Sequence, residues 1–293
     1  MFILFAIAIV VNLTKTNFVK LKKFHGTEFF FKSIDSTQKF ARELIKENLD
    51  EYFEDNKFIT VRATKQEVGV GQYERVWNSP EGNLYLTSII PVPNDKEAQD
   101  LINLSQMISL LIHQILKDYR IDTEIKWIND VMYCGKKISG NLSELYDYNG
   151  SNSGKISKVA IIGIGLNINL SPLGRSTCMK EAFMLNNFIN NNGMVSLNCV
   201  QNISVEDFSD HIACRLGKFF RDFLQTGIKP HLDYINSNLA YAGQNVILNS
   251  REETFKGALK GINDNGMAVL TIDEKEKEFS SGSMFLDLND TDH

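Results

Sequence analysis

Residues 159–169 read VAIIGIGLNIN, an apolar run that predicts a central strand of a β-sheet. Gly163 and Gly165 interrupt the run, and Asn167 follows them. Glycines on a buried strand let a flat or bulky ligand lie against the backbone, although a crowded contact between helix and sheet also requires them. This stretch therefore predicts a sheet with one candidate binding site on its central strand.

Further strands are expected on both sides of this run. They are rich in β-branched and aromatic residues and cover residues 58–64, 84–90, 123–127 and 138–146, the last two joined by a turn at Cys134 and Gly135. After Tyr241 the chain changes to short alternating stretches separated by glycines, a pattern typical of a small all-β barrel.

Three helices are expected between these strands. Asp35-Ser36-Thr37-Gln38 has the form of a helix cap, so a short helix should follow it. Apolar residues at helical spacing over residues 101–115 predict a buried helix capped by Asp95, and Ser204 opens another amphipathic helix. The sequence thus predicts an α+β fold, in which a mixed sheet backed by helices precedes the barrel.

Composition excludes several classes of protein. With 31 basic and 36 acidic residues among 293, the chain has a net charge of −5 and no general attraction to polyanions. No local basic face is apparent, so we expect no nucleic-acid partner. The cysteines, at positions 134, 178, 199 and 214, form no Cys-x-x-Cys pair, which disfavours a zinc ribbon or a disulfide scaffold and indicates reduced intracellular thiols.

The first segment that carries chemistry is residues 66–77, QEVGVGQYERVW. Glycines two apart allow backbone N–H groups to form an anion cradle, and Gln72 and Arg75 would reach a carboxylate or phosphate. Because no Gly-Lys-Ser/Thr follows, this is not a Walker loop. On its own, the segment is better explained by a surface turn.

The second segment is residues 126–140, KWINDVMYCGKKISG. Lysines beside Asn and Asp suit a nucleotide triphosphate, its magnesium ion and a carboxylate, because ammonium groups offset negative charge and oxygen ligands suit a hard cation. A solvated hairpin turn would account for the same residues.

Six motifs occur in a fixed order along the chain. They are Ser36-Thr37-Gln38, the loop 66–77, Ser79-Pro80-Glu81-Gly82-Asn83-Leu84-Tyr85, Lys126-Trp127-Ile128-Asn129-Asp130, Lys137-Ile138-Ser139-Gly140-Asn141-Leu142 and Gly163-x-Gly165-x-Asn167. In this order the chain resembles the biotin protein ligases, which include holocarboxylase synthetase, over residues 31–288. The resemblance implies a class II synthetase-like catalytic fold with a small C-terminal SH3-like β-barrel.

The resemblance also implies an activity and its site. Such enzymes join biotin to ATP, form biotinyl-5′-AMP and pass biotin to a lysine in the biotin carboxyl carrier domain of acetyl-CoA carboxylase or another biotin-dependent carboxylase. Lys137 and Arg75 would be catalytic, with Lys137 holding the biotin carboxylate. Biotin would be bound by Ser36, Thr37, Gln38, Gln66, Gly69, Gly71, Gln72, Trp77, Lys137, Gly140 and Gly163. ATP would be bound by Arg75, Lys126, Trp127, Asn129, Asp130 and Asn167, with Mg²⁺ on Asp130.

Some residues depart from the family pattern. Val70 and Gln72 stand where the glycine loop of the family carries arginines, and Glu74 stands where it has a glycine. Because only Arg75 keeps the positive charge, we expect weaker retention of biotinyl-adenylate. Further departures are Ile128 for proline, Asn141 for an apolar residue and Gln38 for asparagine.

The expected domain boundaries follow from the motifs. Residues 24–240 would form the biotin- and ATP-binding domain, interrupted by an asparagine-rich insertion at 171–203, and residues 241–293 would form the barrel. Residues 1–23 begin with an apolar run too short to span a membrane and continue with a lysine-rich stretch, so they are either a targeting leader or a first strand. The protein is accordingly expected in the cytoplasm, or in a plastid-like or other organelle if the leader is real.

Two other functions stay open at this point. A lipoate or octanoate ligase or transferase shares the architecture, but the Arg-Arg-x-Ser-Gly-Gly-Gly signature typical of those enzymes is absent. A non-catalytic sensor of biotin or nucleotide would explain the altered glycine loop, although it would not need Lys137. The thirty residues before Phe31 are too few for the helix-turn-helix domain of repressor members, so no operator binding is expected. Homodimers formed through sheet edges occur in the family, and the sequence does not decide this point.

Overall fold

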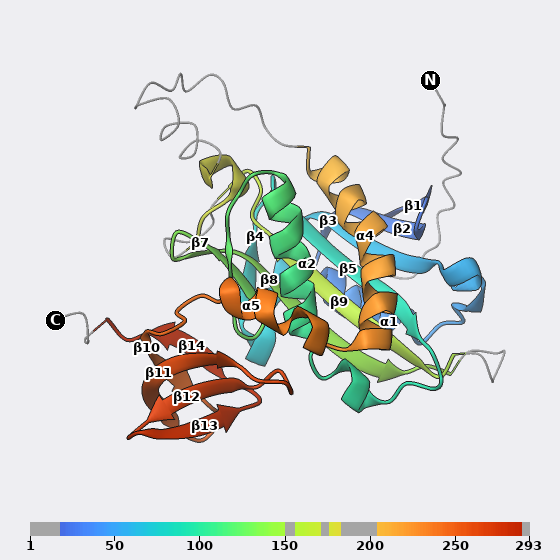
Figure 1. Cartoon of the computed structure of the whole chain (residues 1–293). Helices are drawn as coiled ribbons and strands as arrows, with labels where there is room; N and C mark the ends of the chain where they lie inside the picture. The colour runs from blue at the N-terminus through green and yellow to red at the C-terminus, as the bar shows by residue number, and fades with distance from the viewer. Residues whose placement is uncertain (1–17, 150–155, 171–175, 183–203, 289–293) are drawn as a thin grey trace.

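The computed structural model describes residues 18–149, 156–170, 176–182 and 204–288 (Figure 1). Within these ranges the chain forms a large mixed sheet, helices on both of its faces, and a separate smaller sheet at the C-terminal end. The predicted α+β architecture of a mixed sheet backed by helices is confirmed.

The large sheet has nine strands in the order β1-β2-β3-β5-β9-β8-β7-β6, with β4 paired to β3. Its strands are β1 (Phe18–Lys23), β2 (Gly26–Ile34), β3 (Phe58–Val70), β4 (Val76–Ser79), β5 (Leu84–Val92), β6 (Glu124–Lys126), β7 (Asp130–Tyr133), β8 (Lys136–Asp147) and β9 (Lys158–Leu166). Only the β2–β3 pair is parallel, and every other pair is antiparallel. The predicted central strand is β9, which lies between β5 and β8.

Helices cover both faces of this sheet. They are α1 (Thr37–Leu44), α2 (Leu104–Asp118), α4 (Val205–Thr226) and α5 (Leu232–Ser237). On β9, Ala160 and Ile162 belong to the core under α2 and α4, while Val159 and Ile161 belong to the core under α1. Because side chains alternate between faces along a strand, burial on both faces explains why this stretch is apolar without interruption.

The helix caps follow the sequence at two of three places. The Ser36 hydroxyl accepts a hydrogen bond from the Lys39 amide at 3.4 Å, and Ser204 caps α4 in the same way. The expectation that Asp95 caps α2 is wrong. A capping box of Glu97 and Asp100 closes a separate 3₁₀ turn over Ala98–Leu101, and α2 begins at Leu104.

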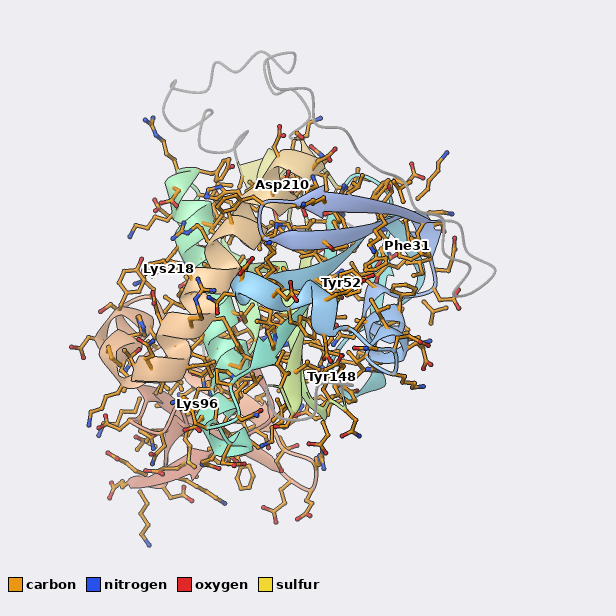
Figure 2. All side chains as sticks on the ribbon, turned by 90° about the vertical axis from the view of Figure 1, so that its right-hand side faces the viewer. Phe31, Tyr52, Lys96, Tyr148, Asp210 and Lys218 are labelled. Atoms are coloured by element: carbon orange, nitrogen blue, oxygen red, sulfur yellow. The ribbon has the colours of Figure 1, made fainter. Side chains whose placement is uncertain are left out.

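The sheet begins at Phe18 and not near residue 24. Residues 18–23, which the sequence left open as the end of a leader, form β1 and pair with β2. Phe18 is buried against the rings of Phe29 and Phe31, and Lys23 pairs with Asp210 of α4 at 3.0 Å. Figure 2 looks onto this edge, where Asp210 lies beside the β1–β2 hairpin. Residues 1–17, including the apolar run, lie outside the described residues.

The predicted insertion at 171–203 is described only at residues 176–182. There the Thr177 amide donates to the Lys137 carbonyl oxygen at 2.9 Å, and Cys178 and Met179 are buried. This part of the segment therefore packs on the large sheet instead of standing apart from it.

The C-terminal unit is an open five-stranded antiparallel sheet in the order β13-β12-β11-β10-β14. Its strands are β10 (Asn245–Asn249), β11 (Thr254–Ile262), β12 (Ala268–Ile272), β13 (Lys275–Phe279) and β14 (Ser283–Leu286). The predicted closure into a barrel is not found in the described residues, since β13 and β14 are not paired with each other.

Four hydrogen bonds join the tip of this sheet to the larger unit. The Gly266 carbonyl oxygen accepts from Gln106 Nε2 at 2.6 Å and from Trp127 Nε1 at 3.1 Å. Asn236 of α5 accepts from the Ile262 amide at 2.7 Å and donates to the Ile262 carbonyl oxygen at 3.0 Å. Because these contacts involve buried side chains of α2 and of the Lys126–Asp130 motif, the two units are held together beside that motif.

Within the parts of the chain that are described, none of the helices is both long and apolar enough to cross a membrane. Cys134, Cys178 and Cys214 are free thiols, as the sequence indicated.

Candidate active site

A cavity of about 720 Å³ opens on the α1 face of the large sheet, where the apolar core of that face ends. Val159 and Ile161 of β9 pack under α1, and the next two residues on the same face are Gly163 and Gly165. Their missing side chains leave room above the sheet for Gln38 and Trp77, whose side chains line the cavity. The cavity walls include most of the predicted site residues, namely Ser36, Thr37, Gln38, Gln66, Gly71, Gln72, Arg75, Trp77, Lys126, Trp127, Asn129, Asp130, Lys137, Gly140 and Gly163.

A chain of hydrogen bonds organises the polar side of the cavity at the start of α1. Gln66 Oε1 accepts from the Thr37 amide at 2.9 Å and from the Thr37 hydroxyl at 3.0 Å. Gln66 Nε2 then donates to the Ser79 hydroxyl at 2.8 Å, which in turn donates to the Trp77 carbonyl oxygen. The amide of Gln66 is thereby fixed in one orientation, and the β3–β4 hairpin is tied to the first turn of α1.

The two glycines of β9 each lie under a side chain of the site. A Cβ at Gly163 would stand 2.4 Å from Gln38 Oε1, and one at Gly165 would stand 2.4 Å from the indole of Trp77. The sequence left two explanations for these glycines, a ligand against the backbone or a crowded packing contact, and the structure shows side chains of the protein packed there. The contact is crowded, and the side chains that crowd it are ones predicted to bind the ligand.

Lys126, Asp130 and Lys137 form a charged cluster beside the indole. Lys137 Nζ lies 2.6 Å from Asp130 Oδ1, Lys126 Nζ lies 3.4 Å from Asp130 Oδ2, and Lys137 Nζ is 4.9 Å from the centre of the Trp77 ring. Gly140 allows this approach, because a Cβ there would stand 2.8 Å from Lys137 Nζ. Burial lowers the pKa of Lys126, while the carboxylate of Asp130 opposes the shift and the charge of Lys137 adds to it.

The cavity carries an excess of positive charge. Among the described residues that line it, Asp130 is the single acid, against Arg75, Lys126, Lys136 and Lys137. Three net positive charges (four cations minus one carboxylate) suit a ligand that carries a carboxylate or phosphates. The acidic net charge of the whole chain is thus compatible with an anionic ligand.

Asp130 fits a magnesium ion only in a limited sense. No group of three or more His, Cys, Asp or Glu side chains in the described ranges is placed to hold a metal. Mg²⁺ is commonly held by one or two carboxylates together with substrate phosphates. One carboxylate is present, so the residues suit an ion shared with a bound nucleotide and do not form a protein-only site.

The last strand of the small sheet supplies a wall of the cavity. Residues 282–286 line it, as does Tyr241 at the domain junction. Arg75 Nη2 donates to the Ser283 hydroxyl at 3.1 Å, and Lys126 Nζ lies 5.2 Å from the ring centre of Phe285. Two cations predicted from the sequence therefore contact β14.

Two predicted ligand residues do not line the cavity. Gly69 lies in the β3–β4 hairpin, where a Cβ would stand 2.3 Å from the Trp77 carbonyl oxygen. A glycine is therefore needed at this position for β3 and β4 to pair. Asn167 is buried, and its Nδ2 donates to the Thr177 carbonyl oxygen at 3.1 Å, so it holds the segment that follows residue 176. Direct binding of biotin by Gly69 and of nucleotide by Asn167 stays a prediction beside these supporting contacts.

Other cavity residues were missed from the sequence. Tyr85 and Thr87 of β5 pair with Gly165 and Gly163 of β9, so they lie on the same face as the glycines. The sequence offered one signal for them. Side chains alternate between faces along residues 84–90, and the polar Thr87 stands at a position expected to be in the core. Nothing local in the sequence connects β14 to the site.

The departure at Asn141 also has a structural explanation. Its Nδ2 donates to the Ser105 carbonyl oxygen of α2 at 3.0 Å, and its amide donates to the Asn129 carbonyl oxygen at 3.0 Å. Asn129 Nδ2 returns a hydrogen bond to the Asn141 carbonyl oxygen at 2.7 Å. Asn141 thus holds the Lys126–Asp130 turn against α2, which an apolar residue would not do.

Comparison with known proteins gives consistent matches. Residues 30–167 match the model of the biotin/lipoate A/B protein ligase family, and residues 241–287 match the biotin protein ligase C-terminal domain. The bifunctional ligase/repressor BirA of Bacillus subtilis is 30% identical over 254 residues, which is 86% of this chain and 72% of that protein. BirA of Escherichia coli is 26% identical over 230 residues, covering 76% of this chain and 65% of that protein.

A solved structure shows the same fold. The biotin protein ligase from Aquifex aeolicus in complex with biotin and ATP superposes with a TM-score of 0.64 at 24% identity, covering 88% of this chain and 98% of that one. The match to the B. subtilis protein and the two domain models together show that this chain belongs to the biotin/lipoate A/B protein ligase family and carries the C-terminal domain of biotin protein ligases.

Proposed function

We propose that the protein is an ATP-dependent biotin protein ligase, which forms biotinyl-5′-AMP and transfers the biotinyl group to a lysine of a biotin carboxyl carrier domain. One observation carries the proposal: the cavity places an amide cluster and an ammonium cluster along one strand. Gln38 lies at Gly163, while Trp77 and Lys137 lie at Gly165 and the paired Gly140. Residues two apart on a strand are about 7 Å apart, which suits an elongated ligand with a polar ring at one end and a carboxylate at the other.

The residues suit the first step of this reaction. A biotin carboxylate oxygen attacks the α-phosphorus of ATP, the bond from that phosphorus to the bridging oxygen breaks, and pyrophosphate leaves. Two anions must approach each other, so fixed positive charge lowers the barrier. Lys137 would exchange its pairing with Asp130 for the carboxylate of biotin, and Lys126 and Arg75 would face the phosphates.

The same groups suit the second step. The lysine amine of the acceptor attacks the acyl carbonyl carbon, and AMP leaves with the electron pair of the broken C–O bond. Negative charge grows on the carbonyl oxygen, next to the place where Lys137 held the carboxylate. Mg²⁺ held by Asp130 and the phosphates would screen charge in the first step.

Incorporation of labelled biotin into a carrier domain tests the proposal. The wild-type protein should release pyrophosphate on addition of biotin, ATP and Mg²⁺ and should label the domain. Lys137→Ala should lower the rate by a factor on the order of 10²–10³, comparable to the loss of one charge-stabilising donor. Lys218→Ala removes an exposed lysine on α4 and should have no effect.

Three other outcomes would point elsewhere. Full activity of Lys137→Ala would remove the central assignment. Turnover of lipoate or octanoate in preference to biotin would indicate an acyl ligase of the same family. Binding of biotin without release of pyrophosphate would indicate a sensor.

A further inference from the structure

The carboxamide of Gln38 is held at its nitrogen end by a residue outside the cavity. Gln38 Nε2 donates to Glu144 Oε2 of β8 at 2.8 Å. The carbonyl end, Oε1, lies over Gly163 and 3.3 Å from the hydroxyl of Thr87, and both of these residues line the cavity. Gln38 itself is 3% exposed, so its amide has little freedom to find other partners.

Glu144 is in turn held by Arg42, one turn further along α1 from Gln38. Arg42 Nε donates to Glu144 Oε2 at 2.9 Å, and Arg42 Nη2 donates to Glu144 Oε1 at 2.6 Å. This two-point pairing fixes the plane of the carboxylate. An ionised carboxylate only accepts hydrogen bonds, so the end of Gln38 that faces it must be the NH₂ group.

The carbonyl oxygen of Gln38 keeps accepting capacity on the cavity side. Thr37 donates its hydroxyl hydrogen to Gln66, so Thr87 has one hydrogen to share between Thr37 Oγ1 at 2.9 Å and Gln38 Oε1 at 3.3 Å. Within the described part of the chain, Gln38 Oε1 therefore uses at most one of its two lone pairs. The other is available to an N–H group of a ligand above Gly163.

We infer that Glu144, held by Arg42, is a positioning residue that sets the polarity of Gln38, so that the cavity offers an acceptor to a ureido N–H of biotin. This inference rests on the proposed function. It identifies Glu144 and Arg42 as the residues that determine which end of the Gln38 amide faces the ligand. Glu144 does not line the cavity and acts through Gln38.

Glu144→Gln tests the inference with an isosteric change. The oxygen of the new glutamine side chain pairs with Arg42, so its NH₂ group faces Gln38. Two NH₂ groups do not hydrogen-bond each other, which favours a flipped Gln38 amide whose NH₂ group faces the ligand. The KM for biotin should rise about tenfold, the cost of replacing one acceptor by a donor. Neither kcat nor the KM for ATP should change. Glu43→Gln is the matched control, because it neutralises an exposed glutamate of α1 that pairs with Lys46.

Selectivity separates a positioning role from a merely structural one. The value of kcat/KM is measured for biotin and for two analogues, each methylated on a different one of the two ureido nitrogens. The wild type should discriminate strongly against at least one analogue, and Glu144→Gln should reduce that discrimination about tenfold. Equal losses for biotin and both analogues would overturn the inference, as would unchanged kinetics.

A second variant keeps the test decisive if Glu144→Gln does not fold. Arg42→Gln removes the two-point pairing from a side chain that is 30% exposed, and it should lower the same discrimination by a smaller factor. Unchanged discrimination in Arg42→Gln would also contradict the inference. If the wild type does not turn over biotin at all, the proposed function fails and this inference fails with it; an active wild type with insensitive variants overturns the inference alone.

Discussion

Single residues of this site carry more than one function. Gly163 and Gly165 are glycines because Gln38 and the indole of Trp77 occupy the positions where their side chains would be. The sequence predicted close approach to the backbone at these positions, but it left open whether a ligand or the protein itself makes the approach. The answer depends on side chains from α1 and β4, which are distant in sequence from β9.

Gly165→Ala should displace the indole of Trp77 and lower the stability of the fold. The added methyl group would stand 2.4 Å from the ring, and overpacking of this kind costs about 1–3 kcal/mol. Urea denaturation measures the cost. The same substitution in a Trp77→Ala background should cost less, since the opposing ring is gone. Strictly additive costs would show that the clash is relieved elsewhere.

At the scale of elements, the β3–β4 hairpin differs most from expectation. Residues 66–77 were treated as a loop, but β3 continues to Val70 and β4 pairs with it. A register shift between Gln66 and Gly69 breaks the alternation that sequence analysis depends on. The loop is thereby reduced to a short turn that includes Gln72–Glu74, where Tyr73 has a φ of 54°.

Gln72→Arg should slow the release of biotinyl-adenylate. Gln72 lines the cavity from this turn, so an arginine there would add a charge-assisted hydrogen bond to the phosphate. We expect dissociation to slow about tenfold, equivalent to about 1.4 kcal/mol. Loss of labelled adenylate from the protein without an acceptor measures the rate. Gln72→Glu should accelerate it, and equal rates in all three proteins would disprove the effect.

The turn between β11 and β12 is the element that joins the two units. Gln106→Leu should remove the 2.6 Å hydrogen bond to the Gly266 carbonyl oxygen and cost about 1 kcal/mol, with Trp127 keeping its own bond. Trp127 is buried at this junction and is one of only two tryptophans in the chain, so its fluorescence reports the separation of the units. Gln106→Glu should cost more, because a carboxylate would face the carbonyl oxygen. Identical urea midpoints for all three proteins would exclude a joining role.

At the scale of the whole molecule, the layered fold was predictable and the completion of the site was not. Periodicity identified the strands and helices, because burial on one or two faces leaves a local pattern. Contacts such as Arg75 with Ser283 join residues more than two hundred positions apart, and no pattern in either segment indicates them. The particular contacts that β14 makes at the cavity therefore became visible only in the structure.

Two buried histidines should make the stability of the molecule depend on pH. Burial lowers the pKa of His25 and of His113 from 6.5 to about 4. The native state then binds fewer protons than the unfolded state between these values, so stability is present above about pH 6.5 and is lost as the pH falls toward 4. From about pH 7.5 to about pH 5, each histidine should contribute a loss of roughly 2 kcal/mol in the free energy of unfolding.

Chemical denaturation at these two values tests the assignment. In His113→Gln the difference between them should shrink by about 2 kcal/mol, because a glutamine does not titrate. His231→Gln, at a more exposed histidine, should leave most of the difference in place. A pH dependence that is the same in all three proteins would exclude His113 as one of its sources.

The position of β14 along the chain has a consequence for biosynthesis. A ribosome completes the large sheet and its helices, through α5, before Ser283–Leu286, and domains generally fold as units during synthesis, with the N-terminal one first. The nascent chain would thus present the amide cluster, the indole and the lysines on an assembled sheet while the cavity still lacks one wall. Translation of its last strands is then the event that completes the cavity, and a prematurely terminated chain would carry the other lining residues without this wall.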